Sequence, residues 1–325
     1  MPQPTPSDVH VDAILTDISV AYIQQASNYV APSVFPAIPV DKQTNKYFTF
    51  TKGDWFRDEA QKRAPATEST GSGFTISTDS YSCDVFAFHK DVDDQTLANA
   101  DNPLQINTAA TQFVTQRMLQ RMENQWTTDY FTTGVWATDV SGVSSAPGAG
   151  EFRQWNDYVN SDPVADVETA KETLLSTTGF EVNTMVVGYS VFKQLKQHPD
   201  IIDRIKYTSS ENVTVGLLAR LFEVERVLVC RAIKNTAAEG RTTSMSFVQG
   251  KSVLLCHVAQ TPALLTPSAG YTFYWTGASD GLGQNIGISS WREQKTRSTR
   301  IEAQMAWDNK VVASDLGYFM ATAVA

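Results

Sequence analysis

Two runs with strand character flank a long polar stretch in the first quarter of the chain. Residues 46–51 are aromatic and β-branched, and residues 74–88 alternate between apolar and polar side chains. The insert between them, residues 52–73, has too few apolar side chains to form a core of its own. A loop of that length without a core is usually functional or disordered. The pattern predicts a long hairpin with a tip that its own chain cannot bury.

Residues 104–131 contain no glycine or proline, and Pro103 precedes them at a position that a helix tolerates in its first turn. Their apolar residues recur at steps of four, which predicts a helix of roughly 40 Å with a slowly winding buried stripe. We interpret this helix as a structural spine and the stripe as core, with Arg117, Arg121 and Glu123 on the solvated face or in subunit contacts. The stripe consists of Ala110, Val114, Met118, Met122, Trp126 and Tyr130.

A glycine-rich stretch, residues 134–162, predicts a boundary before a mixed α/β lobe of roughly 100 residues. Asp162 and Pro163 open a helix over 164–177 that ends at Gly179, and Ser190 is a candidate cap for a later helix. Further helices are predicted at 191–197, 200–206 and 213–221, and strands at 183–189, 224–233 and 252–258.

The two ends of the chain have different patterns. Residues 1–45 contain recurring prolines and one amphipathic segment, 11–30, which predicts an arm; prolines exclude 34–40 from the centre of a sheet. Residues 285–297, 300–308 and 311–323 alternate and predict strands, with a hairpin turn at Asn309 and Lys310 between the last two.

Composition narrows the class of protein. The chain has 325 residues, of which 42% are hydrophobic, and a net charge of −9. An acidic balance argues against nucleic-acid binding as the main task, although it permits a local basic patch. No apolar run is long enough to cross a bilayer, and the N-terminus lacks a basic start, so we expect a cytoplasmic site of synthesis. Cys83, Cys230 and Cys256 show no metal-binding spacing and are predicted to be buried thiols.

The sequence carries none of the common motifs of catalysis. The four histidines show no ligand spacing, and the sequence has neither a GxSxG nucleophile elbow nor a GxxxxGK[ST] phosphate loop. Gly281, Gly283 and Gly287 lack the GxGxxG spacing and precede a strand instead of a helix. We therefore predict no enzyme activity, no catalytic, cofactor-binding or metal-binding residues, and no cofactor.

Two groups of charged residues are candidates for contacts between subunits. One lies in the predicted hairpin tip, and the other lies in the predicted C-terminal strands, where the basic side chains could meet duplex phosphates or acidic residues of a neighbour. We favour pairing with a neighbour, because no aromatic residues are interleaved as in single-strand-binding surfaces. The candidates are Arg57, Asp58, Glu59, Lys62, Arg63, Arg292, Lys295, Arg297 and Arg300.

One stretch of sequence points to a family. Residues 183–207, NTMVVGYSVFKQLKQHPDIIDRIKY, and 221–240, which begin LFEVERVLVCRA, resemble segments of the major capsid proteins of tailed bacteriophages. The order of elements along most of the chain is also similar to these proteins. The resemblance is to the phage major capsid protein E-like family and to the Hong Kong 97-like capsid fold, an α+β fold.

The resemblance implies four parts. These are an N-terminal arm at 1–45, an extended loop hairpin at 46–90, a peripheral domain at 91–162 and 285–325 with the spine helix and terminal strands, and an α/β axial domain at 163–284. It implies a structural protein that assembles with itself into pentamers and hexamers of an icosahedral head around double-stranded DNA.

Further partners implied by the resemblance are a separate scaffolding protein, a portal and, as an open alternative, a decoration protein. Packaged DNA would touch the inner face without sequence-specific binding, and no membrane partner is expected. The location would be the virion capsid, assembled in the cytoplasm of a bacterial host. Two alternatives remain at this point: an encapsulin-like compartment shell, and an α/β enzyme built on residues 163–260.

Overall fold

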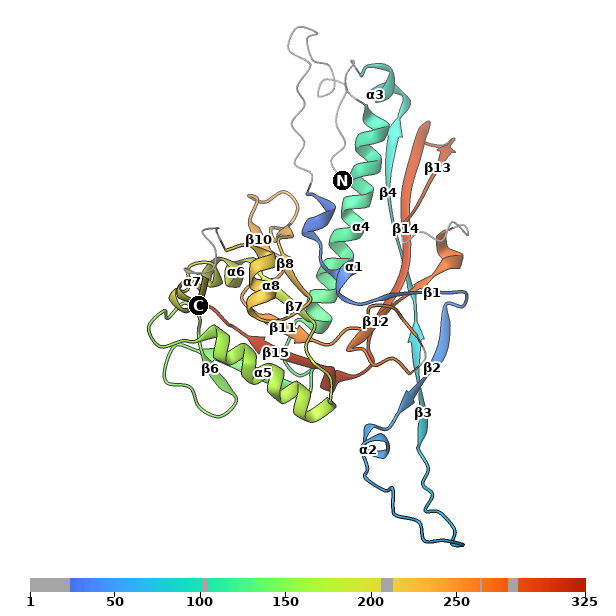
Figure 1. Ribbon diagram of the computed structural model, residues 1–325. Coiled ribbons are helices and arrows are strands. Elements are labelled where there is room, and N and C mark those ends of the chain that lie inside the picture. The colour runs from blue at the N-terminus through green and yellow to red at the C-terminus, as the bar shows by residue number, and fades with distance from the viewer. Residues whose placement is uncertain (1–23, 101–104, 206–212, 264, 280–285) are drawn as a thin grey trace.

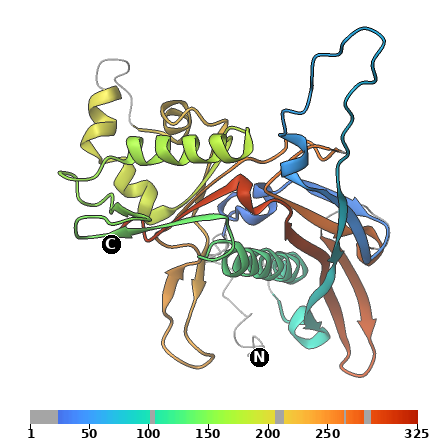
Figure 2. The same cartoon turned by 90° about the horizontal axis from the view of Figure 1, so that it is seen from below.

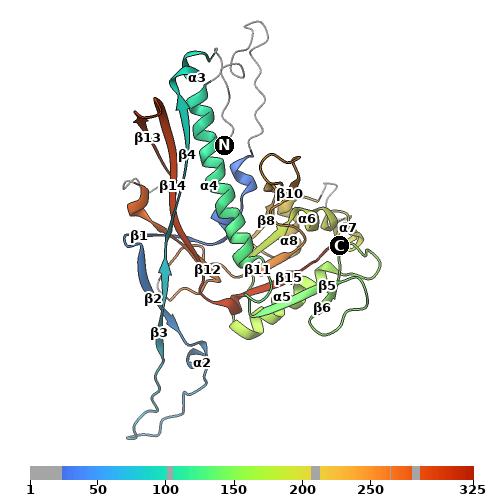
Figure 3. The same cartoon turned by 180° about the vertical axis from the view of Figure 1, so that it is seen from behind.

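The computed structural model describes residues 24–100, 105–205, 213–263, 265–279 and 286–325. An elongated body made of one long helix and a twisted sheet carries a compact α/β lobe on one side (Figure 1). A hairpin stands off one end of the body, and the view from behind shows the same separation of body, lobe and hairpin (Figure 3).

The spine helix is α4, Ile106–Tyr130. Its predicted stripe is confirmed: the residues at steps of four from Ala110 to Trp126 are buried, and Tyr130 packs at the edge of the core. The helix lies along β14 and β4 of the elongated sheet. The prediction for Glu123 is wrong, because its side chain is fully buried. Pro103 lies outside the described residues.

The elongated sheet is organised around β14, Ser298–Val311, a strand of 14 residues. One of its edges pairs with β4, and the other is shared by β13 near its start and β12 near its end. The predicted hairpin turn at Asn309 and Lys310 is wrong, because both residues pair with β12 inside a continuous strand. The remaining strands are β4 (Asp84–Asp93), β13 (Gly287–Glu293), β12 (Gly270–Trp275) and, parallel to β12 at the sheet edge, β1 (Ala37–Val40).

The edge position of β1 has a simple cause. Pro39 has no N–H to donate, so its strand can pair fully on one side only. The arm therefore ends as an edge strand, as the prolines of 34–40 indicated. Before it come the short helix α1 (Ala31–Val34) and the turn η2 (Ala26–Asn28).

The lobe is built on a six-stranded sheet in the order β6-β5-β15-β11-β7-β8. The central strands β7 and β11 are buried along their whole length. The last of the C-terminal strands, β15, pairs with β11 and β5 in the lobe. The strands are β6 (Glu151–Arg153), β5 (Thr138–Val143), β15 (Gly317–Ala321), β11 (Val253–Cys256), β7 (Thr184–Gly188) and β8 (Arg226–Cys230).

Helices pack around this sheet in the order that the sequence predicts. The first, α5 (Pro163–Thr178), is capped by Asp162, which accepts from the N–H groups of Val164 and Ala165, and it ends at Gly179 with a φ of 76°. Ser190 is not a cap, because α6 already begins at Tyr189. The others are α6 (Tyr189–Leu195), α7 (Pro199–Ile205) and α8 (Val215–Leu221).

Two hairpins project from this framework. The long one pairs β2 (Thr44–Phe50) with β3 (Ile76–Ser82), Phe50 opposite Ile76, and so confirms the predicted hairpin. Its tip begins with one helical turn, α2 (Lys52–Trp55). The short one pairs β9 (Ile233–Asn235) with β10 (Met245–Phe247) on the lobe. The small remaining elements are α3 (Asp94–Ala98), η3 (Thr276–Ser279) and η4 (Ser314–Leu316).

The three cysteines are free and buried, as predicted. Among the described residues, no helix is both long enough and apolar enough to cross a membrane. The described residues also contain no cluster of histidine, cysteine and acidic side chains that could hold a metal ion.

Candidate assembly surfaces

The long hairpin β2–β3 exposes large apolar side chains to solvent. Phe48 and Phe56 are each 65% exposed, although large apolar side chains are usually buried. Trp55 and Phe74 lie 5.3 Å apart between ring centroids, and Phe50 completes a small aromatic cluster. An exposed apolar patch is a feature of surfaces that bind another molecule.

The start of the hairpin tip is held to its own chain. Lys52 forms an ion pair of 2.6 Å with Asp315, and the ring of Phe56 lies over Gly179 at the end of α5. Beyond these two contacts, residues 57–76 are exposed along their whole length. The tip is therefore fixed where it begins, and its own chain leaves the rest of this projecting segment uncovered (Figure 1).

The predicted charged residues of the tip are all exposed. Arg57 lies 3.6 Å from Asp54 and 3.7 Å from Glu59, and Arg63 donates to the carbonyl of Thr67. Within the described part of the chain, Asp58 and Lys62 form no ion pair. Exposed pairs at these distances contribute little to stability, so these charges remain available to another molecule.

The predicted basic group near the C-terminus divides into two kinds of residue. Arg292 and Arg300 each form two hydrogen bonds with a carboxylate of their own chain, Asp94 and Asp91 respectively. These hydrogen bonds hold the pKa of both carboxyl groups below the usual range. Lys295 and Arg297 occupy the turn between β13 and β14, and neither forms an ion pair with the described residues.

The two predicted groups do not meet within one chain. The β2–β3 tip stands at one end of the elongated body, and the β13–β14 turn stands at the other (Figures 1 and 3). A contact between them requires two copies of the chain. The prediction that these residues pair between subunits stays a prediction.

Glu123 is a functional residue that the sequence reasoning missed. Its Oε2 accepts hydrogen bonds from the N–H groups of Val30 (2.9 Å) and Ala31 (2.8 Å), so it fastens the arm to the spine helix. Burial raises its pKa from 4.5 to about 7. The only sequence signal was position, because residue 123 falls beside the buried stripe, three residues before Trp126.

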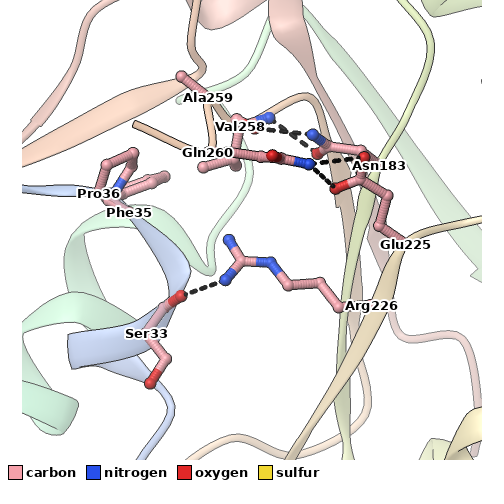
Figure 4. A pocket seen from close by; sticks show the side chains of 9 residues that line it. All are labelled: Ser33, Phe35, Pro36, Asn183, Glu225, Arg226, Val258, Ala259 and Gln260. Carbon is pink, nitrogen blue, oxygen red and sulfur yellow. Dashed lines mark hydrogen bonds between the residues drawn. The ribbon is translucent and has the colours of Figure 1, made fainter. Parts of the chain in front are cut away.

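A second fastening lies between the arm and the lobe, around a pocket of about 230 Å³ (Figure 4). Arg226 donates to the carbonyls of Ser33 (2.9 Å) and Val34 (3.0 Å) and to the hydroxyl of Thr184 (3.0 Å). Across the pocket, Gln260 donates to Glu225. Its nine lining residues include no histidine, cysteine or lysine. Its polar groups instead form hydrogen bonds between segments of the chain, so we interpret the pocket as a structural contact between the arm and the lobe.

His198, in the HPD turn at 198–200, has the partners of a hydrolase triad but not the geometry of one. Its Nε2 lies 3.0 Å from the Ser161 hydroxyl, and its Nδ1 lies 3.5 Å from Asp200. His198 and Ser161 are both buried, and Ser161 donates its proton to the carbonyl of Asp157 at 2.7 Å. Burial lowers the pKa of the histidine. A hydroxyl in this position braces the turn and cannot reach a substrate.

Comparison with known proteins agrees with a shell protein. Residues 153–306 match the family described as phage major capsid protein E. The chain is 28% identical to the major capsid protein of Burkholderia phage BcepMu, over 81% of this chain and 82% of that protein. It is 25% identical to the major capsid protein of Pseudomonas phage JBD67, over 97% of each.

Solved structures share the fold. A phage-related protein from Bordetella bronchiseptica, 24% identical, superimposes with a TM-score of 0.67 over 92% of this chain and 94% of that one. The capsid of cyanophage P-SCSP1u gives a TM-score of 0.59 at 10% identity over 97% and 93%, and an encapsulin complex from Synechococcus elongatus gives 0.57 at 11% over 96% and 95%.

The fold is the Hong Kong 97-like capsid fold, which phage capsids and an encapsulin share. The similarity to two phage major capsid proteins, together with the match of residues 153–306 to the model of phage major capsid protein E, identifies the chain as a phage major capsid protein. Its relatives are structural proteins, not enzymes.

Proposed function

We propose that the chain assembles with itself into pentamers and hexamers of a closed icosahedral phage head around double-stranded DNA, and that it has no catalytic role. One observation carries the proposal: the β2–β3 hairpin exposes an apolar surface that its own chain cannot cover. Burying such a surface against a neighbour releases free energy at roughly 25 cal/mol per Å². A head made of many copies supplies that neighbour in every position.

The opposite ends of the elongated body supply complementary contacts. The β2–β3 tip carries Asp58 and Glu59, and the β13–β14 turn of another copy carries Lys295 and Arg297. We expect the apolar hairpin surface to provide most of the binding free energy and these charges to select the register of the contact. The four-part division into arm, extended loop, peripheral part and axial part belongs to this proposal, with β5, β6 and β15 counted in the lobe.

The further partners belong to the proposal as well. These are a separate scaffolding protein, a portal, a decoration protein as an open alternative, and packaged DNA contacted without sequence specificity. Assembly would take place in the cytoplasm of a bacterial host, and the protein would end in the virion. The support is the similarity to phage major capsid proteins.

The test is negative-stain electron microscopy of the purified chain, alone and with a candidate scaffolding protein. Closed shells, tubes or rings of five or six subunits support the proposal. Particles that remain small under all conditions contradict it. An encapsulin-like compartment shares the fold, so the contents of the particles distinguish the two. A phage head retains DNA in infected cells, whereas a compartment retains a protein cargo.

A paired substitution tests the surface that carries the proposal. Phe48→Ser with Ile76→Ser should abolish assembly and leave thermal unfolding of the subunit unchanged, because both residues are more than half exposed. Leu175→Ser, at an exposed apolar residue of α5, is the matched control and should still assemble. Normal assembly of the hairpin variant would show that this surface is not an interface.

A further inference from the structure

The short hairpin β9–β10 carries a second exposed apolar surface, separate from the long hairpin. Met245 is 55% exposed, Phe247 is 40% exposed and Tyr189 of α6 is 38% exposed. Met245 and Phe247 alternate along β10 and so share one face, and the ring of Tyr189 packs 5.3 Å from that of Phe247. We call these three residues the hairpin patch. Figure 2 shows the yellow-orange hairpin projecting from the lobe on the side where α4 lies.

The surroundings of the hairpin patch are basic in an acidic protein. Residues 189–197 contain two lysines and no acidic residue, and residues 231–251 contain four basic residues and one glutamate. The two segments together therefore carry a net charge of +5, whereas the whole chain carries −9. The exposed cations nearest to the patch in sequence and register include Lys193, Lys196 and Arg241. A ligand for this surface should be apolar on one side and acidic on the other.

The arm is fastened at the root of the same hairpin. The side-chain amide of Gln24 donates to the carbonyl of Ile233 (2.7 Å) and accepts from its N–H (3.0 Å). Ile233 stands directly opposite Phe247 in the β9–β10 register. Tyr29 packs on Ala232 and Val248 at the base of the hairpin. Gln24 therefore lies against the edge of β9 that faces away from β10, at the root of the hairpin.

The direction of the arm is also fixed. Asn28 accepts from the N–H of Arg231, and Gln24 pairs with Ile233, so the arm runs antiparallel to residues 231–233. Within the described residues, the direction from Asn28 to Gln24 therefore points along β9 toward Asn235. Asn235 pairs with Met245, which is the outer member of the hairpin patch.

The sequence that precedes Gln24 has the composition that this surface requires. Its apolar residues fall at helical spacing, and its only charged residues at neutral pH, apart from the terminus, are three aspartates. The first 23 residues contain no lysine or arginine. The apolar residues are Val11, Ile14, Leu15, Ile18 and Tyr22, and the aspartates are Asp8, Asp12 and Asp17.

We propose that residues 8–23 bind the hairpin patch of their own chain, with the apolar side of the segment on Met245, Phe247 and Tyr189 and its aspartates toward the basic rim. This binding goes beyond shell assembly, because it takes place within a single subunit. It covers apolar surface that an isolated subunit would otherwise expose. The short tether at Gln24 favours the same chain over a neighbour, since it keeps the effective concentration of the segment high.

Hydrogen–deuterium exchange of the full-length chain as dilute subunits tests the proposal. Amides of residues 11–22 should be protected at least about tenfold relative to an unstructured peptide. Phe247→Asp should remove this protection, and the fold should survive because the side chain is exposed. Phe48→Asp, on the long hairpin, is the matched control and should leave the protection unchanged.

Charge reversal provides a second, independent measurement. Lys193→Glu with Lys196→Glu should lower the protection of residues 11–22 by about threefold or more, and adding Asp12→Lys with Asp17→Lys should restore it. Restoration requires the two charged groups to face each other, which a general loss of stability would not produce.

Five outcomes would overturn the proposal. They are absence of protection in the native chain, protection that the patch variants do not change, and failure of the reversed charges to restore it. The fourth is protection that rises with protein concentration, which would assign the segment to a neighbouring copy. Binding of a labelled duplex oligonucleotide that depends on Lys193 and Lys196 would likewise overturn it, because the patch would then be open to DNA.

Discussion

At the scale of single residues, the buried side chain of Glu123 connects the arm to the spine helix. Two backbone N–H groups of the arm converge on one carboxylate oxygen inside the core. Desolvation disfavours the charged form more than these hydrogen bonds favour it, so the pKa rises to about 7. The fastening of the arm to the spine helix is therefore linked to proton binding.

Glu123→Gln should remove a pH dependence of stability. The folded pKa of Glu123 lies above its ordinary value, so its contribution is fully present below pH 4.5 and declines until pH 7 is passed. Between about pH 5 and about pH 8 the native subunit should lose about 2–3 kcal/mol of unfolding free energy relative to the Gln variant. Urea unfolding of dilute subunits at both pH values measures this. An equal decline in both proteins would contradict the assignment.

Gly317 illustrates close packing at one atom. A Cβ at this position would lie 2.0 Å from the ring of Trp136. Gly317→Ala should therefore lower the unfolding free energy by about 1–3 kcal/mol, because the buried ring must move. Gly216→Ala is the control, since a Cβ there has nothing within 4 Å and a helical alanine should stabilise by about 0.5–1 kcal/mol. Thermal unfolding compares the two, and equal melting temperatures would contradict the packing argument.

At the scale of elements, the first turn of α5 depends on one side chain. Asp162 accepts from the N–H groups of Val164 and Ala165 at 3.0 Å each. Asp162→Ala should cost about 1 kcal/mol, whereas Asp162→Asn should cost much less because an amide oxygen can cap in the same way. Denaturant unfolding measures both variants. If the alanine and asparagine variants lost equal unfolding free energy, the capping hydrogen bonds would not explain the contribution of Asp162 to stability.

The joint between arm and lobe depends on Arg226. The guanidinium satisfies two carbonyls of the arm and one hydroxyl of β7. Arg226→Met keeps much of the packing but leaves these acceptors without their donor, which should cost about 2–4 kcal/mol. The loss should appear first as faster proteolysis of the arm near residue 30, with Arg231→Met, at an exposed position, as the control. An unchanged rate of proteolysis would contradict the conclusion that Arg226 holds the arm on the lobe.

At the scale of the whole molecule, the basic residues of the C-terminal region divide by partner. Lys295→Ala with Arg297→Ala should leave the melting temperature of the subunit unchanged, because no ion pair of the described chain is lost, and should weaken assembly most at low salt. Arg300→Ala should instead lower the melting temperature, because Asp91 loses its bidentate partner. Light scattering during assembly and thermal unfolding distinguish the two. The reverse assignment of effects would contradict the prediction of subunit contacts at Lys295 and Arg297.

The shell fold itself was accessible from the sequence mainly through resemblance at 183–240, and the comparisons confirm it. The surfaces were less accessible. The candidate residues of the long hairpin do lie on a projecting hairpin. Near the C-terminus, however, the sequence did not reveal which basic residues already pair within the chain, because their partners lie on β4 and just after it. Asp91 pairs with Arg300 because β4 and β14 are neighbours, and these residues lie 209 positions apart in the sequence.

Local pattern determined the elements whose cause is local. The spacing of apolar residues defined α4, glycine and proline marked the ends of α5 and the edge position of β1, and the polar insert defined the long hairpin. Periodicity and capping act within a few residues along the chain, so both can be recognised from the sequence alone.

Tertiary structure alone decided what depends on distant partners. Asn309 reads as a turn residue but is buried in β14, because its side chain accepts from Thr272 of β12 at 2.7 Å. Glu123 reads as a surface charge but is buried, because the arm brings two N–H donors to it. Burying a polar side chain costs free energy unless it gains a hydrogen-bond partner in the core. The position of that partner is set by packing between segments far apart in the sequence.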